Sequence, residues 1–250
     1  MSFTLEICCY NYQSCIIAEA AGADRIELCA DAAEGGTTPG YGTIKLVKEK
    51  AGIDVYPIIR PRGGDFFYNE EEFMVMKSEI LLCKELGCEG VVIGMLKQDG
   101  TIDKNHCKQL VTLAYPMSVT FHRAFDRAIN PFEALEDIIQ IGCERILTSG
   151  HKPVAIEGAQ LLDELIRQAN DRIIIMPGAG IRAANIIDVA KKTGAVEFHS
   201  SASIKINSSM QFVNESMQEN LQTIMADKNE VMGMKENLAA YFSSLNEIHA

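Results

Sequence analysis

The chain has 250 residues, a formal net charge of −11 and a hydrophobic fraction of 47%. This length suits one large α/β barrel or two small domains, and the apolar fraction is enough for a sizeable core. The acidic balance argues against nucleic-acid binding, which needs a basic face. No apolar run of about 18 residues occurs, so we expect no membrane span. The N-terminal stretch lacks the basic and apolar regions of a signal peptide.

The chain contains eight cysteines but no C-x-x-C motif and no spaced Cys/His set of a zinc module. Without a secretion signal, we expect these cysteines to be thiols in a reducing cytosol. The composition therefore predicts a cytoplasmic protein without a disulfide framework.

Apolar runs of strand length alternate along the chain with segments of helical periodicity. The pattern predicts strands at about 4–9, 24–29, 54–60, 90–95, 117–122, 144–149, 172–177 and 195–199. It predicts helices at about 13–22, 40–51, 70–86, 103–114, 131–141, 157–170, 182–193 and 229–246. Residues 200–228 show no clear pattern, and we expect an irregular, mobile excursion there.

Eight strand–helix units in about 250 residues match the (β/α)8 or TIM barrel. We therefore expect a single domain of this fold over residues 1–250. A doubly wound open sheet is the alternative, because local periodicity cannot show whether a sheet closes.

Successive side chains of a strand point to opposite faces, and the helix-covered outside of a barrel must be apolar. In the first strand this rule sends Leu5, Ile7 and Cys9 outward, and Ile26 and Leu28 follow in the second. The side chains predicted to point inward are Glu6, Cys8, Glu27, Cys29, Ile58, Arg60, Thr120, His122, Glu197 and His199.

Unpaired charge is costly to bury, so these inward groups must pair or face an opening that admits water or ligand. Ion pairing is the expected role of the deepest members, Glu6 and Arg25. A polar site is the expectation for the groups nearer the strand ends, which are Cys29, Arg60, His122 and His199.

Two arginines follow the third strand in the run Arg60-Pro61-Arg62-Gly63-Gly64-Asp65. A guanidinium is a fixed bidentate donor, so Arg60 and Arg62 are candidates for a carboxylate or phosphate clamp. An Arg–Asp salt bridge that stiffens the loop is the alternative, and the two roles are compatible. Arg123, after the fifth strand, is another candidate for holding an anion.

Glycine and hydroxyl residues follow the sixth, seventh and eighth strands, at the end where barrels often hold phosphate. Glycine lets backbone N–H groups approach an anion at the start of a helix. The anion-binding candidates here are Ser149, Gly178, Gly180, His199 and Ser201. A tight turn that needs glycine for steric reasons alone is the alternative. The full G-x-G-x-x-G of a dinucleotide site is missing.

Cys8 and Cys29 are predicted on adjacent strands, both inward and near the same end. Paired soft thiolates suit Cu(I). Cysteine is also a common small buried residue, and the residues alone leave both interpretations open.

No nucleophile elbow, P-loop or H-E-x-x-H motif is present. If the protein is an enzyme, His122 is the candidate general acid or base, because an unperturbed histidine side chain changes its charge near neutral pH. Arg60 and Glu27 are the other hypothetical catalytic residues.

Several motifs resemble the CutC family, which is described as a family of copper homeostasis proteins. They occur in order between about 4 and 202 and are Leu5-Glu6-Ile7-Cys8, Gly22-Ala23-Asp24-Arg25-Ile26-Glu27-Leu28-Cys29, Gly35-Gly36-Thr37-Thr38-Pro39, Ile59-Arg60-Pro61-Arg62-Gly63-Gly64-Asp65-Phe66, Thr120-Phe121-His122-Arg123-Ala124-Phe125-Asp126, Ile146-Leu147-Thr148-Ser149-Gly150 and Glu197-Phe198-His199.

The resemblance implies a (β/α)8 barrel, a cytoplasmic location, a homo-oligomer and a role in copper handling. It also implies Cu(I) binding at the positions of Cys8 and Cys29. The chain departs from the family pattern at His151, where members often carry Gln, and at Ala179, within a turn that commonly has three consecutive glycines. The region after about 202 matches poorly.

Two functions follow as hypotheses. In the first, the barrel holds Cu(I) between the two cysteines and buffers or delivers it. In the second, it is an enzyme for a small anionic metabolite, which Arg60, Arg62 and the Gly178 turn hold while His122 acts as acid or base. The expected partners are accordingly a copper ion or a small anion, and neither nucleic acid nor a membrane.

Overall fold

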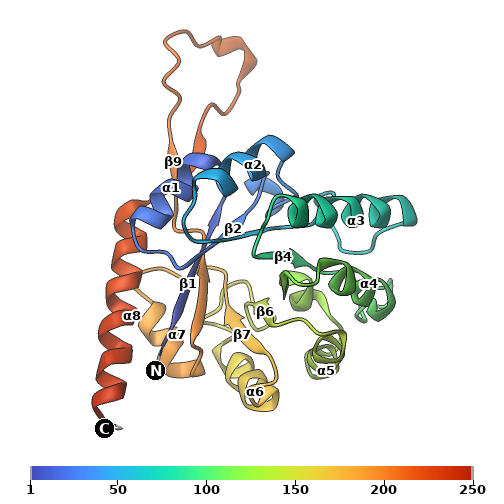
Figure 1. The fold of residues 1–250 in the computed structure, drawn as a ribbon. Helices are drawn as coiled ribbons and strands as arrows, with labels where there is room; N and C mark the ends of the chain where they lie inside the picture. The colour runs from blue at the N-terminus through green and yellow to red at the C-terminus, as the bar shows by residue number, and fades with distance from the viewer. Residues whose placement is uncertain (1, 249–250) are drawn as a thin grey trace.

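The computed structural model describes residues 2–248, and within them eight parallel strands form the centre of the molecule (Figure 1). The strands are β1 (Thr4–Cys9), β2 (Arg25–Leu28), β3 (Asp54–Pro57), β4 (Gly90–Ile93), β5 (Ser118–Phe121), β6 (Arg145–Thr148), β7 (Ile174–Pro177) and β8 (Glu197–Ser200). Each lies inside a predicted strand or within a residue of it, and most are shorter than predicted.

Helices follow the strands and cover the outside of the ring. They are α1 (Tyr12–Ala20), α2 (Tyr41–Lys50), α3 (Glu70–Glu85), α4 (Lys104–Ala114), α5 (Pro131–Ile141), α6 (Ala159–Ala169), α7 (Ile186–Thr193) and α8 (Lys228–Ile248), with short 3-10 turns η1 (Ala32–Glu34), η2 (Arg123–Arg127) and η3 (Glu215–Met217). Local capping sets several of these bounds. The Asn69 side chain accepts a hydrogen bond from the Glu72 N–H, and the Glu72 side chain accepts one from the Asn69 N–H. This reciprocal cap starts α3. Gly142 ends α5 at a φ of +97°.

The strands close into a barrel, so the open-sheet alternative is excluded. Hydrogen-bonded ladders join β3, β2, β1 and β8 in one run and β4, β5, β6 and β7 in another. A parallel bridge between Ile58 and Val92 connects the two runs. Within residues 2–248 no ladder pairs β7 with β8, but the two strands lie in contact and complete the ring.

The predicted side-chain faces are confirmed. Leu5, Ile7, Ile26 and Leu28 belong to the main hydrophobic core, which lies between the strands and the helices. A smaller cluster fills part of the barrel interior and consists of Cys8, Cys29, Tyr56, Ile58 and Val92. The interior is therefore lined by few apolar groups, and polar side chains occupy the rest.

Ion pairs neutralise the deepest interior charges, as predicted for Glu6 and Arg25. Arg25 donates from Nε to Glu6 Oε2 at 2.5 Å and from Nη2 to Glu197 Oε2 at 2.6 Å. Arg145 Nε reaches the same Glu197 oxygen at 3.2 Å, a contact that the sequence did not predict. All four side chains are buried, so each depends on its partners for the hydrogen bonds it has lost to water.

Where an irregular excursion was expected, the structure has a two-stranded antiparallel arm that projects from the barrel (Figure 1). Its strands are β9 (Ser203–Ile206) and β10 (Thr223–Ala226), and residues 207–222 between them form the tip. The base of the arm docks on α1, since Asn11 Nδ2 donates to the Ile224 carbonyl at 2.8 Å and the Ala226 N–H donates to Ser14 Oγ at 3.1 Å.

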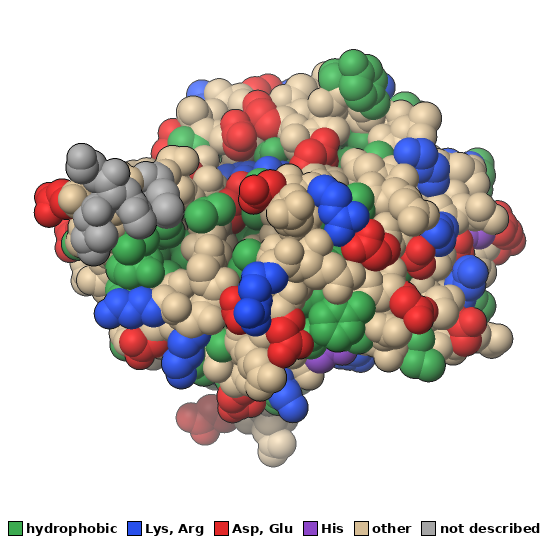
Figure 2. All heavy atoms as spheres, turned by 90° about the horizontal axis from the view of Figure 1, so that it is seen from below, with side chains coloured by type: hydrophobic (Ala, Val, Ile, Leu, Met, Phe, Trp, Pro, Cys, Tyr) green, Lys and Arg blue, Asp and Glu red, His purple; other side chains and the backbone are tan. Residues whose placement is uncertain are grey.

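No helix among the described residues is long and apolar enough to cross a membrane. Figure 2 shows one face of the molecule, on which Lys and Arg side chains alternate with Asp and Glu. This face carries no broad basic patch of the kind that binds nucleic acid.

Candidate functional site

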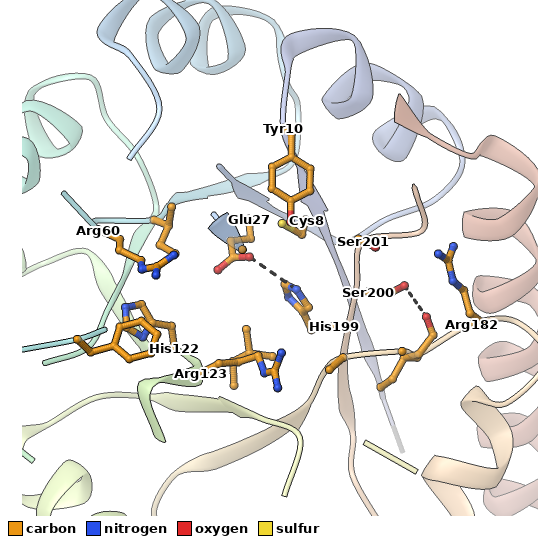
Figure 3. A pocket seen from close by; sticks show the side chains of 17 residues that line it. Cys8, Tyr10, Glu27, Arg60, His122, Arg123, Arg182, His199, Ser200 and Ser201 are labelled. Carbon is orange, nitrogen blue, oxygen red and sulfur yellow. Dashed lines mark hydrogen bonds and ion pairs between the residues drawn. The ribbon is translucent and has the colours of Figure 1, made fainter. Parts of the chain in front are cut away.

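A cavity of about 240 Å³ opens at the carboxyl ends of the barrel strands (Figure 3). Its polar lining includes Glu27, Arg60, His122 and His199, which come from or directly follow β2, β3, β5 and β8. The sequence predicted that these four side chains meet around one opening, and their common cavity confirms it. Cys8 on β1 lines the same cavity.

The two predicted thiols lie side by side in the barrel wall. β1 and β2 pair in parallel with Cys8 opposite Glu27, which places Cys29 diagonally across from Cys8. A hydrogen bond joins the two Sγ atoms at 3.5 Å. Both residues are buried, and Cys8 is the member that faces the cavity.

A carboxyl group stands next to the thiols. One oxygen of Glu27 and the Sγ atoms of Cys8 and Cys29 all lie within 4.8 Å of one another. Two sulfurs and an oxygen that converge in this way can surround a metal ion. The backbone of Gly36 covers Cys29 from the loop side, where a Cβ would approach its Sγ to 3.2 Å.

His199 connects this group to the interior ion pairs. Its Nδ1 lies 2.7 Å from Glu6 Oε1, and its Nε2 lies 3.6 Å from Glu27 Oε2 (Figure 3). Burial opposes a charge on His199, but Glu27, Cys8 and Glu6 outweigh it and raise its pKa well above the usual value. The Glu6 carboxylate supports this charge whether or not Glu27 carries a proton.

The protonation states of the thiols differ because their surroundings differ. The hydrogen bond with Cys29 outweighs burial and, with help from His199, holds the pKa of Cys8 well below the ordinary thiol value. Burial, followed by the bond with Cys8, raises the pKa of Cys29. Burial and the Cys8 charge likewise raise the pKa of Glu27. The arrangement favours a Cys8 thiolate beside two protonated neighbours.

His122 lies across the cavity from His199 (Figure 3). Its Nδ1 accepts from the Ala124 N–H at 3.2 Å, and its buried Nε2 has no protein partner among the described residues. Burial and the nearby Arg60 charge lower the pKa of His122 to about 3. A neutral ring at physiological pH can donate from Nε2 but is a poor proton acceptor, which counts against the general-base role considered from sequence.

Arg60 enters the cavity, but most of its hydrogen bonds go to the surrounding loops. Its Nη1 donates to the carbonyls of Glu34 at 2.6 Å and Gly36 at 2.8 Å, and its Nη2 donates to that of Gly64 at 3.0 Å. Only Nε, which is buried, has no acceptor among the described residues. Arg60 therefore ties together the loops after β2 and β3, and among its nitrogens only Nε makes no hydrogen bond to them.

The prediction of a two-arginine clamp is wrong, because the structure separates Arg62 from the cavity. Arg62 binds Glu72 at 2.6 Å and Asp65 at 3.0 Å on the outer side of the loop. Its side chain is not among those that line the cavity. The Arg–Asp salt bridge considered as the alternative is the interaction that forms.

Arg123 does line the cavity, and Ser149 holds it from behind. Its Nε donates to Asp126 Oδ2 at 2.8 Å and its Nη2 donates to Ser149 Oγ at 3.0 Å. Ser149 is fully buried and does not reach the cavity surface. Ser149 was predicted to bind the anion itself, but in the structure it orients Arg123 instead.

The glycines after β7 differ in role. Gly180 lines the cavity at a φ of +70°, and Ser201 after β8 lines it too. Gly178 does not, and a Cβ there would lie 2.4 Å from Leu147 and 3.3 Å from the His199 ring. The steric interpretation accordingly holds for Gly178, which lets His199 and Leu147 come close.

Sequence reasoning missed several lining residues, among them Tyr10, Phe66 and Arg182. Tyr10 follows β1 directly, so its place after a strand end was a signal that could have been used. Arg182 lies in the loop between β7 and α7. Phe66 belongs to a loop, and its ring centroid lies 4.9 Å from that of His122, a contact that no local pattern predicts.

The fold and site define a class, a TIM-barrel protein whose polar cavity contains a pair of thiols at the carboxyl ends of its strands. Residues 3–204 match the sequence profile of the CutC family. A CutC family protein of Parabacteroides distasonis is 48% identical over 242 residues, which cover 96% of this chain and all of that protein. The chain belongs to the CutC family.

Other relatives carry the same family name. The human protein named copper homeostasis protein cutC homolog is 47% identical over 86% of this chain and 79% of its own length. The crystal structure of the putative copper homeostasis protein CutC from Streptococcus agalactiae has a TM-score of 0.76 and 33% identity, and covers 80% of this chain and 98% of its own.

Solved structures outside the family support the barrel fold alone. Phosphoribosyl anthranilate isomerase from Thermotoga maritima has a TM-score of 0.59 at 12% identity, and the match covers 96% of this chain and all of that one. At that identity the likeness concerns the fold and not the chemistry.

Proposed function

We propose that this protein serves copper homeostasis by binding Cu(I) between Cys8 and Cys29 and holding or delivering the ion. The observation that carries the proposal is the 3.5 Å separation of two buried Sγ atoms on adjacent strands, one of them on the wall of an open cavity. The relatives named for copper homeostasis support the same cargo.

The chemistry of the donor set suits Cu(I) as the transported ion. Soft thiolates select Cu(I), and a buried site with few water molecules protects the reduced ion. Because the pKa of Cys8 is lowered, its thiolate forms more readily than that of an ordinary cysteine and can receive the ion. Glu27 is close enough to contribute an oxygen to the ion.

A competition titration with reduced protein and a Cu(I) chelator, under anaerobic conditions, tests the proposal. The Cys8→Ser/Cys29→Ser variant is expected to lose Cu(I) affinity by more than about 100-fold, which exceeds the usual effect of changing a residue that only supports the ligands. Cys143→Ala is the matched control, since Cys143 is equally buried but belongs to the outer core. Equal affinities in the double variant and the unaltered protein would remove the thiol pair as ligands.

A cytoplasmic location and self-association, both expected from the family resemblance, belong to the same proposal. The arm tip supports self-association, because it exposes the apolar side chains of Met210, Phe212, Val213 and Met217. Large apolar side chains exposed together on one segment are typical of protein contacts. Sedimentation of a variant in which a short turn replaces residues 207–222 is expected to show a smaller species than the full chain. An unchanged mass would exclude the arm as the contact.

A further inference from the structure

One side of the cavity presents hydrogen-bond donors that the protein itself does not use. His122 Nε2 and Arg60 Nε are both buried and both lack a partner among the described residues. Arg123 uses Nε and Nη2 for Asp126 and Ser149, and no acceptor within residues 2–248 takes its Nη1. These three groups line the same cavity, on the side away from Cys8 (Figure 3).

The tautomer of His122 follows from a backbone contact. Because its Nδ1 accepts from the Ala124 N–H, the proton of the neutral ring must be on Nε2. This Nε2–H is buried and has no acceptor among the described residues, and His122 is one of the side chains that line the cavity. Buried donors are nearly always paired in folded proteins, so an orphaned one at a cavity wall indicates a missing ligand.

The interior carboxylates that the structure describes have other partners and do not satisfy these donors. Glu6 and Glu197 are bound by Arg25, and Asp126 is bound by Arg123. Glu27 interacts with His199 at 3.6 Å. Although the chain as a whole carries a net charge of −11, this side of the cavity is positive and rich in donors.

The cavity is larger than a copper ion requires. Its volume of about 240 Å³ compares with about 30 Å³ for each water molecule in the liquid. Apolar side chains of Ile58, Phe66 and Leu147 form part of its wall. A space that combines apolar walls with a few convergent polar groups is typical of a small-molecule site.

We infer that this side of the cavity binds the oxyanion, carboxylate or phosphate, of a small organic molecule. His122 Nε2–H, Arg60 Nε–H and Arg123 Nη1–H donate to the oxyanion, and Ile58, Phe66 and Leu147 contact the body of the ligand. The site lies opposite the thiols and does not depend on them, so it is separate from the proposed copper site.

The test uses copper-free, reduced full-length protein with ¹⁵N-labelled histidine. The probes are inorganic phosphate, glycerol 3-phosphate and succinate, each at millimolar concentration. Binding is expected to shift the Nε2 resonance of His122 and to raise the melting temperature. Comparing succinate with glycerol 3-phosphate and inorganic phosphate distinguishes a carboxylate site from a phosphate site.

Variants assign the effect to the donors. Binding of the active probe is expected to weaken by about tenfold or more in His122→Phe and in Arg123→Gln, because each loses a donor to a charged group. Arg123 is partly exposed, so its variant keeps the inference testable if His122→Phe does not fold. Arg62→Gln is the control, since Arg62 is equally charged but lies outside the cavity.

The Cys8→Ser/Cys29→Ser protein is expected to bind the active probe with the same affinity as the unaltered protein. This result separates the inference from the copper proposal. The inference is overturned if no probe moves the His122 resonance. It is equally overturned if Arg62→Gln weakens binding as much as Arg123→Gln, or if loss of the thiols abolishes it.

Discussion

Glu27 and His199 face each other across the floor of the cavity, with Oε2 of one 3.6 Å from Nε2 of the other. The opposite nitrogen of His199 is bound to Glu6, so the imidazole links a buried ion pair to the thiol site. Through this contact, the charges that hold the barrel together also set the protonation of the candidate copper ligands.

The pKa values of the two cavity histidines are expected to be shifted in opposite directions. The pKa of His199 is raised by Glu27, Cys8 and Glu6 against the effect of burial, whereas burial and Arg60 lower that of His122 to about 3. Histidine ring NMR between pH 5 and pH 8 should show His122 neutral throughout and should place the His199 midpoint above the ordinary value. A His122 signal that titrates near the ordinary value of about 6.5 would contradict the burial of its ring.

Removing Arg25 is expected to destabilise the barrel strongly. Arg25→Met leaves Glu6 and Glu197 buried without their main partner, and breaking a buried pair costs about 3–5 kcal/mol. Urea unfolding followed by circular dichroism measures the loss. Arg172→Met is the control, because the Arg172–Glu136 pair lies on the surface and its removal is expected to change stability little.

The same ion pairs predict how stability depends on acid. Burial opposes ionisation of Glu6, but Arg25 and His199 outweigh it and lower the pKa to about 2, below the value of about 4.3 for an unfolded glutamate. The stabilisation is therefore complete above the unfolded pKa and is lost as the pH falls from about 5 toward 2. The free energy of unfolding of the unaltered protein should drop through this window by an amount on the order of 3 kcal/mol from this group.

Glu6→Gln supplies the comparison for the acid dependence. The variant is less stable at neutral pH, because Arg25 and His199 lose their partner, but its stability should fall less steeply below pH 5. Parallel curves for the variant and the unaltered protein would show that Glu6 does not carry the effect.

Gly94, which follows β4, makes room for the His122 ring. A Cβ at this position would lie 2.5 Å from Cε1 and Nδ1 of His122. Gly94→Ala is expected to displace the ring and to cost about 1–3 kcal/mol in urea unfolding, as overpacking commonly does. Gly42→Ala serves as the control, because a Cβ at that α2 position meets nothing within 4 Å and alanine favours the helix. A Gly94→Ala protein as stable as the control would refute the steric role.

The barrel could be predicted because its signals are local and repeated. Alternation within β1 and β2 separated Leu5 and Ile7 from Glu6 and Cys8, and closing the ring then brought the inward groups to one end. The arm could not be predicted in the same way. Its strands have four residues each and stand well apart in the sequence, and β9 is largely exposed. Their base is fixed by contacts with Asn11 and Ser14, more than 200 residues away.

The site was predicted in its residue types more accurately than in its bonds. Alternation along the strands is enough to predict which strand ends carry Cys8, Glu27, His122 and His199. The hydrogen bonds of Arg60 could not be predicted in this way, because they depend on the positions of three loop carbonyls. Arg62 shows the limit most clearly. It stands two residues from Arg60, yet the path of the loop turns it outward to Glu72.

X-ray absorption of the protein loaded with one equivalent of Cu(I) tests the central claim most directly. Binding between the paired thiols predicts a copper edge typical of Cu(I) and a first shell with two sulfur neighbours, one of which is lost in Cys29→Ser. A first shell composed of nitrogen and oxygen alone, or one that Cys29→Ser leaves unchanged, would contradict the assignment of Cys8 and Cys29 as the copper ligands.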